Sequence, residues 1–427
     1  MEGMDESMSA PAQGTARDAL SVKPFRNLLA ATFISNSGRW LQFAALGILG
    51  WELTGSSAFL GQLIFAQLAP LGVLSLIGGS LADTMNRRTL LLVTQAWQMG
   101  WTFVLAAFLI DGTIGEGTLL LLVFIIGLGQ GLYAPAFTSV LPLLAGPENI
   151  RAAVSLNSVQ LNAARVVGPA IGGVLATTLG FAELFAINAA TYLVVIGAVA
   201  VLALPKPTAK AATLSDRIFG GFGIVRHAPQ VRGPIVLMAM FALFCLPFVG
   251  QLPAIAEVNL GIDSQSQQYA WFYATFGAGA LVGAVLVSTI LLSFPRPLLV
   301  KLTLLGFAAS LAWLAVLDNI ALGYIAIFLV ALFYFILPTA LASHWQEHVA
   351  ESVRGRIAAL WILSFGGMVP IANLIGGRFA EITSLTSLML VGVVAAVILS
   401  LSFTLRTGDV VDEDSISGAP RGPVPVG

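Results

Sequence analysis

The sequence predicts an all-α membrane protein with twelve transmembrane helices arranged in two six-helix bundles. Three observations support this: the composition, the length of the apolar segments, and one long polar stretch near the middle. Hydrophobic residues make up 57% of the chain and charged residues 10%, against about 45–50% and about 25% in soluble domains. Because a water-soluble fold of this size has no place for so much apolar surface, we expect lipid to surround most of the chain.

Twelve apolar segments are long enough to cross a bilayer, because a hydrocarbon core of about 30 Å needs about 20 helical residues. The first six segments are at about 26–50, 57–82, 89–110, 118–144, 152–179 and 182–204. The second six are at about 234–256, 268–292, 298–317, 321–343, 356–378 and 384–405. Each segment is therefore a predicted membrane-crossing helix.

The longest polar stretch inside the chain separates the two groups of segments. Within it, Leu214, Ile218, Phe222 and Val225 recur at helical spacing and predict a short helix on the membrane surface. The predicted domains are a cytoplasmic tail (1–24), an N-terminal bundle (25–204), a cytoplasmic linker (205–233), a C-terminal bundle (234–406) and a second cytoplasmic tail (407–427).

The basic residues predict the orientation in the membrane. With both termini in the cytoplasm, 17 of the 20 Lys and Arg residues fall in cytoplasmic segments, as the positive-inside rule requires. The outer loops carry acids instead, namely Glu52, Asp111, Glu116, Glu183, Asp263 and Asp318. We therefore expect a multi-pass membrane protein with both termini inside.

Several classes of function lack any sequence signal. The single cysteine, Cys245, excludes an intramolecular disulfide and a thiolate metal cluster. The polar N-terminal stretch has no apolar core, so it does not read as a signal peptide. We find no catalytic triad, nucleotide-binding glycine loop or basic nucleic-acid surface, so we expect no enzyme activity, no cofactor and no nucleic-acid partner.

Charge is concentrated in the predicted cytoplasmic turn between the second and third segments. The stretch G-S-L-A-D-T-M-N-R-R runs from Gly79 to Arg88. Gly79 permits close helix packing, and Asp83 can face the N-terminus of a neighbouring helix. Arg87 and Arg88 are suited to pairing with acids or lipid phosphates.

This stretch resembles the signature G-x-L-a-D-r-x-G-r-r that the major facilitator superfamily carries in the same loop. Thr84 and Asn86 depart from it, because the family prefers Arg and Gly there. The resemblance implies a transporter in which this turn latches the cytoplasmic side shut. A generic basic turn is the alternative interpretation.

A glycine-proline pattern in the fifth segment narrows the resemblance. Gly168, Pro169, Gly172 and Gly173 resemble the G-P-x-x-G-G element of facilitator-superfamily exporters. A glycine face permits tight packing, and a proline removes one backbone hydrogen bond and permits a bend. The resemblance implies a gating role that favours efflux, whereas ordinary small-residue packing is the alternative.

Three further stretches resemble the branch of the superfamily that contains the enterobactin exporter and macrolide efflux pumps. They are LTGSSAFLG (53–61), GLYAPAFTSVLPLL (131–144) and WQEHVAESVRGRIAAL (345–360). Part of the last stretch echoes PENIRAAVSLN after the fourth segment, and we include its Arg354 among the gating residues. The resemblance implies a secondary transporter of the bacterial inner membrane that exports an amphipathic small molecule, siderophore or drug-like, by alternating access.

Two arginines lie near the predicted midplane of the membrane. Arg39 and Arg165 are each about fourteen residues into their segments, where a cation costs about 2.5–3.5 kcal/mol and normally faces a cavity or a partner. No midplane acid is available to pair with them. We therefore predict a substrate cavity for an anionic or catecholate-like solute, with Trp40 and Tyr133 as apolar neighbours. The alternative is that the arginines only brace the helices.

Proton antiport is the expected source of energy, by resemblance to the family. Related exporters often carry an arginine three residues before a Gln-Gly pair, but Gly127 occupies that position here. Glu257 is our candidate for proton coupling, because neighbouring apolar residues would raise its pKa. His344 and His348 lie on one helical face without a third ligand, so we predict no metal site there.

Two other functions remain open: an organic-anion uptake carrier and a lysophospholipid flippase. For the favoured exporter, the expected partners are a small-molecule substrate, protons as the coupling ion and membrane lipids. We expect a monomer.

Overall fold

The computed structural model describes residues 14–176, 178–204, 222–406 and 410–412. For some helical residues, among them Gly79, Asp83 and Gly173, only the backbone is described. The described part of the chain is helical, with one isolated bridge between Val349 and Val411. The predicted surface helix lies largely outside the described residues, although 222–227 are helical.

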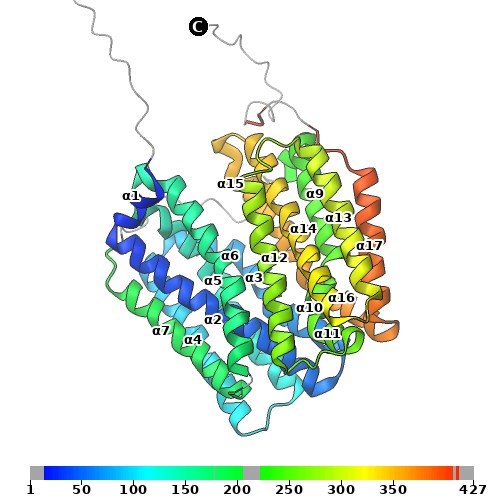
Figure 1. Ribbon diagram of the computed structural model, residues 1–427. Coiled ribbons are helices and arrows are strands. Elements are labelled where there is room, and N and C mark those ends of the chain that lie inside the picture. Colours follow the sequence, from blue (N-terminus) through cyan, green and yellow to red (C-terminus); the bar gives the residue numbers. More distant parts are fainter. Residues whose placement is uncertain (1–13, 177, 205–221, 407–409, 413–427) are drawn as a thin grey trace, which may run out of the picture.

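The first helix set comprises the helices before the linker. They are α1 (Ala16–Ser21), α2 (Lys23–Thr54), α3 (Ser57–Thr84), α4 (Arg87–Ile110), α5 (Glu116–Ala145), the 3-10 turn η1 (Pro147–Asn149), α6 (Ile150–Ala176) and α7 (Phe181–Ala200). Within the set, α3 packs on α5, α4 on α7, and α2 on both α6 and α7. Figure 1 shows these helices side by side in blue to green.

The second helix set comprises the helices after the linker. They are α9 (Pro229–Cys245), α10 (Pro247–Gly250), α11 (Leu252–Leu260), α12 (Gln267–Ser288), α13 (Arg296–Val316), α14 (Ile320–Glu347), α15 (Glu351–Ile362), the π-helix η2 (Leu363–Gly367), α16 (Met368–Ile382) and α17 (Leu385–Ser402). Here α14 packs on α12 and α13, and α13 packs on α17. The two sets meet along α3 with α16 and along α6 with α12 (Figure 1).

Short turns between long helices are possible because the sequence supplies capping residues. Ser56 accepts a hydrogen bond from the Phe59 amide at the start of α3, and Asn86 accepts from the Arg88 and Thr89 amides in the first turn of α4. Gly55 ends α2 with φ +58°, a conformation that favours glycine. The charged motif turn is therefore only two residues long, with α3 ending at Thr84 and α4 beginning at Arg87.

Two predicted helices are interrupted. The segment expected at 234–256 consists of α9, α10 and α11, with breaks before Pro247 and before Pro253. A proline lacks the amide hydrogen that continues a helix, which explains both breaks. The segment expected at 356–378 runs from Glu351 to Ile382 with a five-residue π-helix inside it. Such insertions are frequent at functional sites.

Eight helices of the described chain are long and apolar enough to cross a membrane. The helices α2 and α6 are not among them, although they have 32 and 27 residues. Both carry polar residues in mid-helix, including Arg39 in α2 and Arg165 in α6. Arg39 and Arg165 thus lie in two long helices that are not among the eight, whereas α3 and α9 are apolar over shorter stretches of the described residues.

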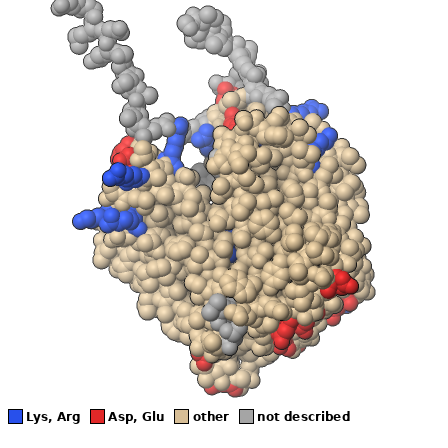
Figure 2. All heavy atoms as spheres, viewed as in Figure 1, with Lys and Arg blue, Asp and Glu red and all other residues tan. Residues whose placement is uncertain are grey.

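Charges separate to the two ends of the molecule. Figure 2 shows Lys and Arg mostly at the end where α2 and α4 begin, which we call the basic end. Most of the acidic side chains in view lie at the opposite end, which we call the acidic end, and a few lie among the basic ones (Figure 2). Between them the visible surface is almost free of charge, as expected for a surface that faces lipid.

Candidate functional site: a cavity between the helix sets

A cavity of about 290 Å³ lies between the two helix sets. Arg39 and Trp40 of α2 and Arg165 of α6 line it on one side. Tyr334 and Phe335 of α14 line it on the other. Three of the four predicted substrate residues therefore meet in one cavity.

Arg39 faces the cavity without an ionic partner. Its side chain is half-buried and forms no hydrogen bond or ion pair with any residue that the structure describes. The guanidinium groups of Arg39 and Arg165 are close enough for their charges to repel each other. The cavity thus has a positive potential that an anion would neutralise.

Arg165 is held between two aromatic rings, one from each helix set. Its Cζ atom lies 5.1 Å from the centroid of the Trp40 ring and 5.0 Å from that of the Phe335 ring. Each cation–π contact contributes about 0.5–2 kcal/mol, depending on desolvation. The Arg165 Nε atom is buried and has no hydrogen-bond partner among the described residues, while Nη1 reaches Asn162 Oδ1 at only 3.5 Å. The side chain therefore braces the helix sets and still has an unused donor.

Four glutamines, which the sequence analysis did not select, extend the polar lining. They are Gln42, Gln67, Gln98 and Gln130. Asn188 of α7 donates to Gln42 Oε1, which fixes that side chain. Gln67 and Gln130 form no hydrogen bond with a described residue, so their amides remain available. The sequence signal that could have identified them is a glutamine side chain in the middle of an apolar segment.

The wall formed by the second helix set is aromatic. It includes Tyr273 and Phe276 of α12, Tyr334 and Phe335 of α14, and Phe365 of the π-helix η2. Tyr334 and Phe335 lie with ring centroids 4.4 Å apart, and Phe276 lies 6.2 Å from Tyr334. These rings offer flat apolar surfaces to a ligand.

Tyr133, the fourth predicted substrate residue, is not among the residues that line the cavity. It is buried in α5 and stacks on Phe137, with ring centroids 5.5 Å apart. Glu257 also lies elsewhere, since its side chain is exposed on α11 rather than packed among apolar residues. Nothing in the structure places Glu257 near the cavity arginines.

The glycine-proline motif of α6 packs against the cavity segment of α2. A Cβ atom on Gly168 would lie 2.4 Å from the Ser37 carbonyl oxygen and 2.8 Å from the Trp40 Cβ atom. One on Gly172 would lie 3.0 Å from Leu41 Cγ. Only glycine at 168 permits this approach, which sets the position of α2 beside Arg165.

Part of the charged turn at the basic end ties neighbouring helices together. Arg88 Nη2 donates to the Ala200 carbonyl at the end of α7. Arg354, in α15, reaches the Val349 carbonyl at 3.4 Å. Only the backbone of Gly79 and Asp83 is described, so their predicted latch contacts stay predictions.

The two helix sets are joined by hydrogen bonds at the acidic end. Glu381 of α16 accepts from Ser56 Oγ at 3.2 Å and from the Ala58 amide at 3.3 Å. Glu52 accepts from Ser264 Oγ at 2.7 Å. A Cβ atom on Gly61 would lie 2.3 Å from the Asn373 carbonyl oxygen. These contacts close the acidic end.

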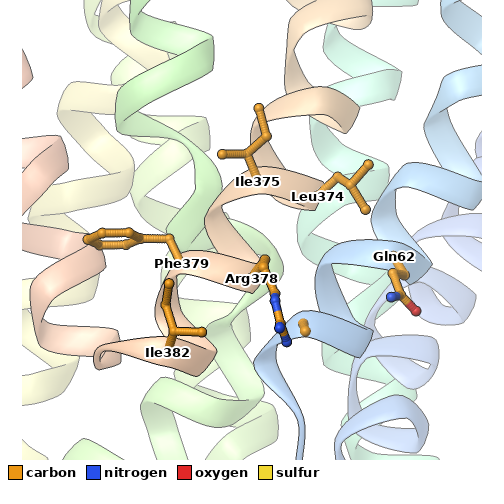
Figure 3. A pocket seen from close by; sticks show the side chains of 7 residues that line it. Gln62, Leu374, Ile375, Arg378, Phe379 and Ile382 are labelled. Atoms are coloured by element: carbon orange, nitrogen blue, oxygen red, sulfur yellow. The ribbon is translucent and has the colours of Figure 1, made fainter.

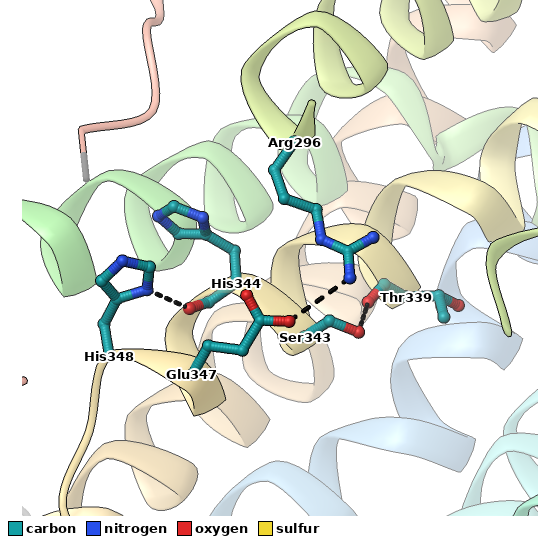
Figure 4. Close-up of polar contacts among 6 residues, drawn as sticks. All are labelled: Arg296, Thr339, Ser343, His344, Glu347 and His348. Atoms are coloured by element: carbon teal, nitrogen blue, oxygen red, sulfur yellow. Dashed lines mark hydrogen bonds and ion pairs between the residues drawn. The ribbon is translucent and has the colours of Figure 1, made fainter. Parts of the chain in front are cut away.

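The histidine pair at the basic end of α14 makes structural contacts. His348 Nδ1 lies 2.7 Å from the His344 carbonyl, and Glu347 pairs with Arg296 at 3.3 Å (Figure 4). His344 Nε2 lies 3.2 Å from the carbonyl of Arg406. The polar groups thus connect α14 to α13 and to the end of the chain after α17.

Comparison with known proteins defines the class. The model of the transmembrane secretion effector family matches residues 15–425. The enterobactin exporter EntS of Escherichia coli O1:K1 is 25% identical over 388 residues, which cover 84% of this chain and 90% of EntS. The fold and the relatives are those of transporters rather than enzymes, and the protein is a multi-pass membrane transporter of the major facilitator superfamily.

Within that class, the chain belongs to the transmembrane secretion effector family of exporters. Solved structures agree in fold. The nucleoside transporter NupG superposes with a TM-score of 0.73 at 11% identity, covering 89% of this chain and 98% of NupG. A bacterial homologue of the human lysosomal transporter Spinster, solved inward-facing and unoccupied, gives 0.65 at 16% identity, covering 91% and 95%.

Proposed function

We propose that the protein exports an amphipathic small molecule with an anionic group, siderophore- or drug-like, across the bacterial inner membrane. The observation that carries the proposal is the cavity in which Arg39 has no ionic partner opposite a wall of aromatic rings. A guanidinium binds carboxylate or phosphate oxygens through a planar fork of donors. Exporter relatives favour this function over an uptake carrier or a lysophospholipid flippase.

For the architecture, we propose twelve membrane-crossing helices in two six-helix bundles, spanning 25–204 and 234–406. The basic end faces the cytoplasm together with the linker and both tails, because 17 of the 20 Lys and Arg residues are assigned to that side. The interrupted helices α9 to α11 and α15 to α16 would each count as one crossing. Since one chain supplies the whole cavity, we propose a monomer.

Transport would proceed by alternating access. Because hydrogen bonds hold the two helix sets together at the acidic end, we propose that this state takes up substrate from the cytoplasm. Opening outward would break the Glu381 and Glu52 hydrogen bonds and close the basic end through the 79–88 turn and Arg354. Gly168, Pro169, Gly172 and Gly173 would let α6 move against α2. We propose proton antiport by family resemblance. Glu257 is the candidate for the proton-carrying residue, but its exposed position does not favour that role.

Transport into inverted membrane vesicles tests the proposal. Labelled siderophore-like anions, macrolides and cationic dyes are offered with and without an imposed pH gradient. We expect gradient-dependent accumulation of anions, reduced about tenfold or more by Arg39→Gln, since a hydrogen bond to a charged group contributes about 1.5–3 kcal/mol.

Two variants control this experiment. Arg39→Lys keeps the charge and is expected to retain part of the transport, whereas Arg226→Gln removes an exposed arginine outside the cavity and is expected to have no effect. Accumulation of cationic dyes that Arg39→Gln leaves unchanged would contradict the anionic substrate.

A further inference from the structure

A groove of about 620 Å³ lies on the surface where α3 meets α16, near the acidic end. Figure 3 shows Arg378 projecting between the two helices, with Gln62 on α3 and Leu374 and Ile375 on α16. Ile375 is 59% exposed and Ile382, at the end of α16, is 67% exposed. The groove is therefore an apolar surface open to the membrane, with one cation in it.

The position of Arg378 is exceptional in this chain. Seventeen of the 20 Lys and Arg residues are assigned to the cytoplasmic side, and two others, Arg39 and Arg165, line the central cavity. Arg378 is the remaining one, and it lies near the acidic end, four residues before the C-terminal limit of α16. A basic residue on this side of a membrane helix runs against the usual distribution.

No described side chain neutralises Arg378. It is exposed, and it forms no ion pair or hydrogen bond within the described part of the chain. Glu381 lies one turn further along α16, but its carboxylate accepts from Ser56 Oγ and the Ala58 amide instead. The nearest acid in the sequence is thus engaged in closing the acidic end.

The depth of the groove matches a phospholipid. Arg378 is four residues before Ile382, or about 6 Å along the helix axis, from which its side chain reaches the headgroup region. Gln62 is five residues into α3 and so lies at a similar depth. Leu374 is one turn deeper than Arg378. The two polar donors, Arg378 and Gln62, thus lie at a similar depth in the membrane. Apolar side chains line the groove towards the membrane interior.

We propose that this groove binds an anionic glycerophospholipid of the outer leaflet. Its phosphate contacts the Arg378 guanidinium and the Gln62 amide, and one acyl chain lies along Leu374 and Ile375. The lipid is a resident ligand and not the transported molecule, so the inference goes beyond the proposed function. Because it touches both α3 and α16, it bridges the helices whose contact closes the acidic end.

Quenching by brominated lipids tests this directly. The full-length protein carries Ile382→Cys labelled with a fluorophore, since the native Cys245 is buried. It is reconstituted in phosphatidylcholine vesicles that contain brominated phosphatidylglycerol or brominated phosphatidylcholine. We expect phosphatidylglycerol to be preferred about fivefold, the effect of about 1 kcal/mol from one arginine near an anionic lipid. Arg378→Gln is expected to abolish this preference, and Arg378→Lys to retain it.

A label at Val316→Cys is the matched control, because Val316 ends α13 at the same end of the molecule and is 72% exposed, but does not line the groove. It is expected to show no preference. Equal preference at both positions, or a preference that survives Arg378→Gln, would overturn the proposal. Relief of quenching by millimolar inorganic phosphate would also overturn it, because the site would then take free phosphate. Anion transport into vesicles without phosphatidylglycerol reports separately on the proposed function.

Discussion

The two walls of the cavity differ in chemistry, although the two helix sets that build them echo each other in sequence. Of the described residues that line the cavity, the first helix set supplies both arginines and all four glutamines. The second set supplies no charged side chain and presents Tyr273, Phe276, Tyr334, Phe335 and Phe365. A substrate that matches both walls has an anionic, hydrogen-bonding side and a flat apolar side. The difference between the two walls therefore predicts the orientation of the substrate in the cavity as well as its chemical class.

Reversing the charge of the polar wall should have the largest effect. Arg39→Glu replaces an attraction by a repulsion, and two charges 4 Å apart interact by about 4 kcal/mol at an intermediate dielectric constant. We expect anion transport to fall by about 100-fold or more and transport of cationic dyes to appear. Initial rates in inverted vesicles measure both. Arg226→Glu, outside the cavity, should change neither, and undiminished anion transport by Arg39→Glu would refute the assignment of the polar wall.

Removing one ring from the aromatic wall should have a smaller effect on transport, and this effect should not depend on the charge of the substrate. Phe335→Leu removes a ring that faces the cavity and lies 5.0 Å from Arg165. Together, the lost stacking and cation–π contacts amount to about 1.4 kcal/mol, or about a tenfold rise in KM for charged and neutral aromatic substrates alike.

The control for this variant is Phe365→Leu, because Phe365 lines the same wall but makes no cation–π contact with Arg165. Its KM effect should be weaker, since only stacking on the substrate is lost. If Phe335→Leu affected charged substrates only, the aromatic wall would act through Arg165 and not through the substrate.

The sequence predicted the polar wall better than the aromatic one, for a physical reason. A charge in an apolar segment is costly, so Arg39 and Arg165 were conspicuous. An aromatic residue in such a segment is ordinary, so nothing distinguished Phe335 or Phe365 from residues that face lipid. Tyr133 shows the same ambiguity: the sequence predicts it as a cavity residue, whereas in the structure it stacks on Phe137 and does not line the cavity.

The helical segments were predictable because composition and length determine them. The expected segment at 118–144 corresponds to α5 at Glu116–Ala145, for example. The interruptions within the helices were harder to predict. Pro247 and Pro253 signalled breaks that the apolar run concealed, and the π-helix at Leu363–Gly367 depends on packing against α3 and α9. That packing brings Phe365 into the cavity lining, so a residue of the aromatic wall depends on tertiary contacts that periodicity does not reveal.

The smallest expected effect concerns a neutral residue of the polar wall. Gln67→Leu keeps the side-chain volume nearly constant and removes one amide that has no partner among the described residues. One hydrogen bond contributes about 0.5–1 kcal/mol net, so the KM of substrates with several acceptors should rise about threefold. Gln346→Leu, an exposed glutamine of α14 that does not line the cavity, should leave KM unchanged. An equal rise in both variants would mean that the effect does not come from the cavity lining. A rise in KM for Gln67→Leu alone would show that the amides of the polar wall bind substrate as well as its two cations. Hydrogen bonding would then help to determine which anions the cavity accepts.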